Sequence, residues 1–95
     1  MNLTRKQKDR IITVLKKAKP HLAFNYCFYV CIAVEETDCN QKDKSLTKTY
    51  VEEQIYPHYT VVRWLVENYD IRLKGEQAIE YRRHWVDHMI QELSE

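Results

Sequence analysis

The stretch Pro20–Glu36, with the sequence PHLAFNYCFYVCIAVEE, decides the fold class. Between Leu22 and Val34 only Asn25 is plainly polar. Aromatic and β-branched residues favour strands, but the run is longer than an ordinary strand and contains no turn signal. Pro20 suits the first turn of a helix, where its missing N–H costs nothing. We therefore predict a helix over Pro20–Glu36 that is apolar on all sides and forms the buried centre of the molecule.

The segments on either side of this run show the periodicity of amphipathic helices. Thr4 and Gln7 have the spacing of a capping box and predict the start of a first helix. Its apolar stripe consists of Ile11, Val14, Leu15 and Ala18. After a polar loop over residues 37–44, in which Cys39 is the expected exposed thiol, further helices are predicted over 45–55, 60–69 and 76–93. The chain is thus predicted to be one all-α domain over residues 1–95, a compact bundle of about five helices around a buried central helix.

The net charge of +1 hides a strong asymmetry along the chain. Residues 1–20 carry seven lysines and arginines against the single acid Asp9, whereas the remainder holds eight basic and thirteen acidic residues. A basic first helix on an acidic body indicates contact with nucleic acid or association between copies, so a homo-oligomer is expected. The polar residues after Met1 and the short apolar run argue against a signal peptide and a membrane span. Three cysteines fit reduced thiols, and we expect a cytoplasmic protein.

Arg82 is the most informative single residue. On a helical wheel of residues 76–93 it falls in the middle of the apolar stripe, between Met89 and Leu93. A guanidinium keeps its proton, so a buried one must be paired. One alternative is an internal partner, with Asn25 and Glu36 as the candidates; the other is an anionic group of another subunit or of a ligand.

Aromatic and basic residues alternate in YPHYTVVRW, residues 56–64, and in YRRHW, residues 81–85. Rings that stack on a base and guanidinium groups that bind phosphate are the parts of a nucleotide pocket. The same residues also suit a helical core and its rim. The candidate ligand- or partner-binding residues are Arg82, Arg83, Trp85, Trp64, Arg63, His58 and Tyr59.

Metal and catalytic chemistry are not predicted. His84 and His88 lie one helical turn apart, but opposite the apolar stripe and without a third ligand, which favours a solvated face. Cys27 and Cys31 also lie one helical turn apart, and a zinc site with Cys39 and His21 is the alternative, but the spacing matches no standard zinc ribbon or finger. Cys27 and Cys31 are therefore expected to be buried, inert thiols. The sequence contains no recognisable nucleophile–base pair or convergent acidic set, so we expect no cofactor and no enzymatic activity.

Nucleic-acid binding is the alternative function. The helices over 45–55 and 60–69 have the outline of a helix-turn-helix, but the second helix offers only Arg63, Glu67 and Asn68 to base edges. The first helix is better suited to contact phosphates. Its candidate residues are Arg5, Lys6, Arg10, Lys16 and Lys17.

The Trp64-Leu65 pair followed by RRHWVDHMIQEL, residues 82–93, resembles small helical accessory proteins of bacteriophages and related mobile elements. The resemblance covers about the last third of the chain. It implies a role by binding, in the cytoplasm of a host cell, as an inhibitor of host defence, a ligand sponge or a regulator. We therefore expect a non-enzymatic binding protein, a counter-defence type of factor that binds or sequesters a host protein or a small anionic nucleotide.

Overall fold

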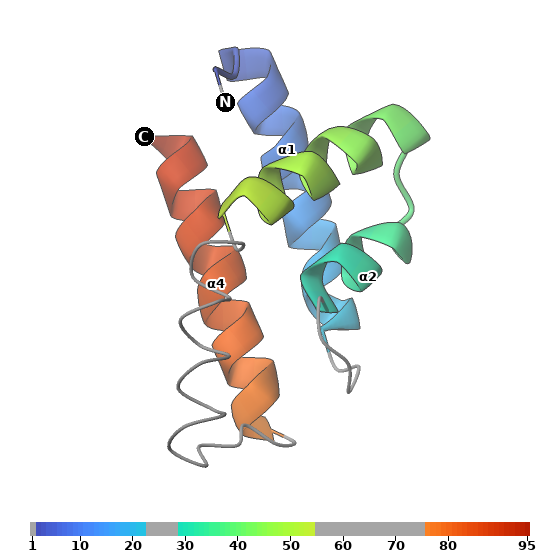
Figure 1. Ribbon diagram of the computed structural model, residues 1–95, viewed down its shortest axis with the longest axis vertical. Helices are drawn as coiled ribbons and strands as arrows, with labels where there is room; N and C mark the ends of the chain where they lie inside the picture. Colours follow the sequence, from blue (N-terminus) through green and yellow to red (C-terminus); the bar gives the residue numbers. More distant parts are fainter. Residues whose placement is uncertain (1, 23–28, 55–75) are drawn as a thin grey trace.

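The structure is a computed structural model that describes residues 2–22, 29–54 and 76–95. Within these ranges every regular element is helical (Figure 1). The elements are α1 (Arg5–Ala18), the 3₁₀ helix η1 (Lys19–His21), α2 (Tyr29–Glu35), a helix over residues 41–54, and α4 (Glu76–Ser94). The all-α prediction is therefore confirmed, and the described helices share one hydrophobic core.

The first helix forms as its sequence predicts. The Thr4 hydroxyl oxygen accepts a hydrogen bond from the Gln7 N–H at 3.1 Å, and the Thr4 N–H donates to Gln7 Oε1 at 2.9 Å. This reciprocal pair is a complete capping box and satisfies two N–H groups at the helix start. All four members of the predicted stripe are buried, and α1 packs against both α4 and α2. Among the described elements, α1 is thus the one around which the others pack.

The prediction of a buried central helix over Pro20–Glu36 is wrong about where the helix begins and about how much of it is buried. Pro20 lies inside η1, directly after α1, and α2 begins at Tyr29. A proline ring clashes with the carbonyl of the preceding helical turn, so Pro20 helps to end α1 as a 3₁₀ turn. The helix α2 buries Val30, Ala33 and Val34, whereas Glu35 is exposed. A helix that is buried on one side only cannot be the centre of five helices.

The helix over residues 41–54 begins four residues before its predicted start. Asn40 precedes it, and Asn40 Oδ1 accepts a hydrogen bond from the Asp43 N–H at 2.9 Å. The Asn40 amide also donates to Asp43 Oδ2 at 2.9 Å, which fixes the cap. Residues 41–44 are therefore helical rather than part of a polar loop. Cys39, predicted to be exposed, is half-buried against the core.

The last helix, α4, matches its predicted range of 76–93 to within one residue. It buries Arg82, Val86, Met89 and Leu93 along one side. It runs beside α1 in the opposite direction, so that the start of α1 meets the end of α4 (Figure 1). The predicted helix over 60–69 and its helix-turn-helix connection lie outside the described residues. None of the described helices is both long enough and apolar enough to cross a membrane.

Candidate functional site

Arg82 is buried, with only 6% of its surface exposed, which confirms the prediction made from the helical wheel. Its Nη1 donates a hydrogen bond to the backbone carbonyl of Leu22, the residue that follows η1. The predicted carboxylate partner, Glu36, is instead exposed, and Asn25 lies outside the described residues. The carbonyls at the end of a helix lack partners within that helix. Arg82 supplies a donor there, so part of its function is to join the end of η1 to α4.

Arg83 is exposed and lies on a different side of α4 from Trp85. Two residues along a helix correspond to a rotation of about 200°. The structure therefore does not bring Arg83 and Trp85 together, although the sequence placed both in one candidate site. The other candidates of that set, His58, Tyr59, Arg63 and Trp64, lie outside the described residues.

A shallow hollow of about 160 Å³ lies on α4, and its described lining consists of His84, Trp85 and His88. We call it the α4 hollow. Trp85 is half-buried, while both histidines are exposed. The rings of Trp85 and His88 meet edge to face, with centroids 5.9 Å apart and planes at 86°. This is a favourable arrangement of two aromatic rings, and it holds the imidazole against the indole.

A carboxylate lies beside His88, one of the residues that line the α4 hollow. His88 Nε2 is 3.2 Å from Glu92 Oε1, one helical turn further along α4. Both side chains are about half exposed, at 50% and 46%, so their attraction is screened by water. The sequence contains a signal for the α4 hollow. On the helical wheel, Trp85 falls at the edge of the apolar stripe of α4, next to the face that carries His84 and His88. A helical wheel separates the apolar stripe of α4 from the face that carries the histidines, and the α4 hollow lies where the two meet.

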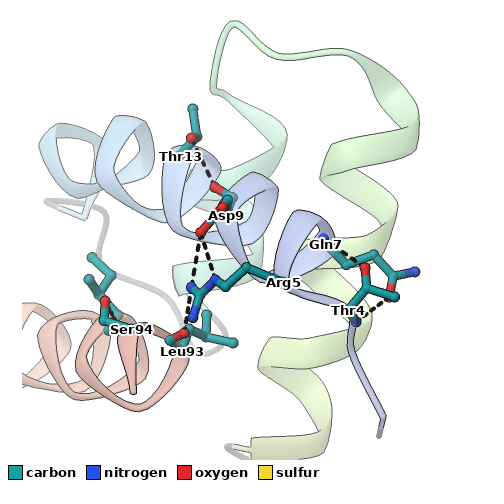
Figure 2. A network of polar contacts seen from close by, with 8 residues as sticks. Thr4, Arg5, Gln7, Asp9, Thr13, Leu93 and Ser94 are labelled. Atoms are coloured by element: carbon teal, nitrogen blue, oxygen red, sulfur yellow. Dashed lines mark hydrogen bonds and ion pairs between the residues drawn. The ribbon is translucent and has the colours of Figure 1, made fainter.

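Three of the six basic residues of α1 have partners within the protein. Arg5 contacts Asp9 Oδ1 at 2.9 Å through Nη2 and also donates to the Leu93 carbonyl at 2.8 Å (Figure 2). Arg10 Nε lies 4.0 Å from Asp43 Oδ1, and Lys17 Nζ donates to the Asp38 carbonyl at 3.3 Å. Lys6 and Lys16, the other two candidates for phosphate contact, are exposed. Three of the five predicted nucleic-acid contacts thus already have protein partners.

Cys31, in α2, has the environment of an unreactive thiol. Cys31 is half-buried. Burial raises the pKa of its thiol, the charge of Glu52 raises it further, and Lys48 acts in the opposite direction. A raised pKa lowers the fraction of nucleophilic thiolate. In residues 2–22, 29–54 and 76–95, no group of three or more His, Cys, Asp or Glu side chains is placed to hold a metal ion.

No protein-family model, curated protein or solved structure matches this chain. The resemblance to phage accessory proteins therefore stays a prediction.

Proposed function

We propose that this chain is a non-enzymatic binding protein that contacts a protein partner through the α4 hollow. One observation carries the proposal: a half-buried indole, Trp85, is flanked on the same helix by two exposed imidazoles, and all three border one hollow. Large aromatic side chains that line or fill pockets contribute much of the binding energy at protein interfaces. Tryptophan suits this role because it combines a wide apolar face with an N–H donor.

The size of the α4 hollow favours a protein over a small nucleotide. Sites for small molecules usually measure about 300–1,000 Å³, and the hollow measures about 160 Å³. It can receive one ring or one side chain, and a protein partner can make its remaining contacts on the surrounding surface. A nucleotide would also need a cation for its phosphates. Arg82 donates to the Leu22 carbonyl instead, and Arg83 lies on another side of α4.

The proposed biological role follows from binding without catalysis. The resemblance to phage accessory proteins supports a regulator or counter-defence factor that sequesters a host protein in the host cytoplasm. Assembly of this chain into a homo-oligomer is also proposed, on the basis of its basic first helix and acidic remainder.

Affinity capture from a host-cell lysate tests the proposal when the wild-type chain is compared with matched variants. We expect His88→Ala and Trp85→Ala to lose a captured protein that the wild type retains. Arg83→Ala is the control, because Arg83 is also exposed on α4 but on a different side. His88 is exposed, so its removal should leave the thermal melting curve nearly unchanged. Equal capture by wild type and by folded His88→Ala and Trp85→Ala would overturn the proposal.

Native mass spectrometry of the purified protein separates the partner classes. It reports the subunit number and any retained ligand in one measurement. A retained nucleotide that disappears in Trp85→Ala would replace the protein partner by the nucleotide alternative. A monomer at all concentrations would overturn the proposed homo-oligomer.

Nucleic-acid binding is a second candidate, supported by Lys6 and Lys16. Both are exposed, and within the part of the chain that the structure describes neither side chain makes a polar contact. Each lysine that neutralises a phosphate adds about 0.9 to the slope of log affinity against log salt on duplex DNA. Replacing both lysines with glutamine should therefore reduce the steepness of this salt dependence by about 2. Failure of the wild type to bind DNA or RNA at low salt would remove this candidate.

A further inference from the structure

Four ionisable residues follow one another along α4 at intervals of four: Glu80, His84, His88 and Glu92. Each successive member is rotated by about 40° and displaced by about 6 Å along the helix. They therefore form one gently winding stripe, with the two imidazoles in the middle and a carboxylate at each end. All four side chains are exposed.

We propose that His84 and His88 together bind one divalent transition-metal ion, of the class of Zn²⁺, Ni²⁺ or Cu²⁺. Imidazole is a preferred ligand of all three ions. Residues four apart on a helix have Cβ atoms about 5–6 Å apart, and two histidines at this spacing hold zinc in helical metalloprotease motifs. The exposed pair therefore has the spacing of a chelate.

The α4 hollow shows that the two imidazoles border a common space. Its volume of about 160 Å³ exceeds the share of a few water molecules, each about 30 Å³. An ion with part of its hydration shell fits there. Trp85 fixes the ring of His88 from one side through the edge-to-face contact at 5.9 Å. A ligand that is already oriented loses less conformational freedom when the ion binds.

The carboxylates at the ends of the stripe favour a cation in the hollow. Glu92 Oε1 lies 3.2 Å from His88 Nε2, and Glu80 lies one turn before His84. A carboxylate beside a metal-binding histidine can accept the ring N–H that does not face the metal, which orients the ring and makes it a better donor. The nearby cation Arg83 lies on another side of α4, and Lys19 Nζ is paired with Asp87 at 2.6 Å.

Two protein ligands leave the remaining coordination positions to water or to an exogenous group. Such a site exchanges its ion readily, and it is compatible with the lack of a three-ligand group among the described residues. The inference goes beyond the proposed function, although both use the α4 hollow. It is measured with the metal ion alone, so either can fail without the other.

The test is a titration of the full chain with Ni²⁺ that is monitored by isothermal titration calorimetry. We expect one ion per chain, and His84→Asn or His88→Asn should weaken its affinity by about tenfold or more, since even changes beside a metal ligand cost about 10–100-fold. The matched control is His21→Asn, which removes a half-exposed imidazole of η1 and should leave the affinity unchanged.

A spectroscopic readout places the ion. Bound Ni²⁺ or Cu²⁺ quenches a nearby indole, and Trp85 adjoins His88. In a Trp64→Phe background, quenching should follow the calorimetric binding curve and should be lost with His88→Asn. Binding that survives the double variant His84→Asn/His88→Asn would show that thiols or other imidazoles hold the ion, and would overturn the proposal. Failure of the wild type to bind Ni²⁺ would also overturn the proposal.

Discussion

The antiparallel pair α1 and α4 is closed at both ends by the same kind of contact. At one end, Arg5 in the first turn of α1 donates to the Leu93 carbonyl in the last turn of α4, at 2.8 Å (Figure 2). At the other end, Arg82 of α4 donates to the Leu22 carbonyl, directly after η1. Each helix thus supplies a cation to the carboxyl end of the element beside it. Both the unpaired carbonyls and the helix dipole favour positive charge at these places.

The two ends differ in their exposure to water. The side chain of Arg5 is 52% exposed and is shared with Asp9, whereas Arg82 is 6% exposed. In water a charge loses little when a partner is removed, because solvent replaces it. In the core no such replacement exists, and a buried carbonyl without its donor carries a desolvation cost. We therefore expect burial, rather than the type of contact, to decide how much each arginine stabilises the fold.

The largest expected effect is that of Arg82→Met. Methionine fills much of the volume but leaves the Leu22 carbonyl without this donor. A hydrogen bond from a charged group is worth about 1.5–3 kcal/mol, so we expect a loss of about 2–3 kcal/mol in the free energy of unfolding by urea. Arg82→Lys, which keeps the charge but not the planar fork, should fall between methionine and wild type. A loss below about 0.5 kcal/mol for Arg82→Met would remove the difference between the two ends.

Arg5→Met should cost less, about 0.5–1 kcal/mol, because its contacts are exposed. The loss should shrink as salt is added, because salt weakens the attraction between solvent-exposed charges. Lys6→Met is the matched control: Lys6 is the exposed neighbour on α1, and its replacement should be nearly neutral. Urea unfolding of both variants at low and high salt measures the loss in the free energy of unfolding and its dependence on salt. An Arg5→Met loss that equals that of Arg82→Met would contradict the role of burial.

The parts of this fold that sequence could predict are those with local signals. The capping box of Thr4 and Gln7 and the 3.6-residue periodicity specify α1 almost completely. The same periodicity placed Arg82 inside the apolar stripe of α4, where the structure has it. The Asn40–Asp43 cap was also visible in the sequence, but the polar composition of residues 37–44 obscured it. Local chemistry, where it is specific, determines local structure.

The remaining features depend on which surfaces meet. The apolar composition of Pro20–Glu36 shows that this run buries something, but not that α2 buries only one side. The acceptor of Arg82 is a backbone carbonyl, which every residue possesses, so side-chain identity could not point to Leu22. The α4 hollow arises at the border of two helix faces that a wheel treats as separate. These features are tertiary, and no local pattern encodes them.

Asp9→Asn should have a smaller effect than either arginine variant. Asp9 Oδ1 accepts from Arg5 Nε at 3.1 Å and from Nη2 at 2.9 Å, but both side chains are largely exposed. Exposed pairs four residues apart on a helix contribute about 0.2–0.5 kcal/mol. We expect a loss of about 0.3 kcal/mol in urea unfolding at low salt. Arg5 keeps the Leu93 carbonyl in this variant, so a loss as large as that of Arg5→Met would show that Asp9 positions the guanidinium.

The smallest expected effect is the coupling between the two ends, measured with the double variant Arg5→Met/Arg82→Met. The fourteen residues of α1 separate the ends, which at 1.5 Å per residue is about 20 Å. Substitutions more than about 10 Å apart without shared partners usually add to within about 0.5 kcal/mol. The double variant should therefore lose the sum of the two single losses, at high salt as well as at low salt. A coupling above about 1 kcal/mol would mean that one end loosens the other, so that α1 and α4 separate as a unit once either arginine is removed. In that case the exposed end would depend on the buried one, and the low cost of Arg5→Met would reflect the intact contact at Arg82 rather than the water around Arg5.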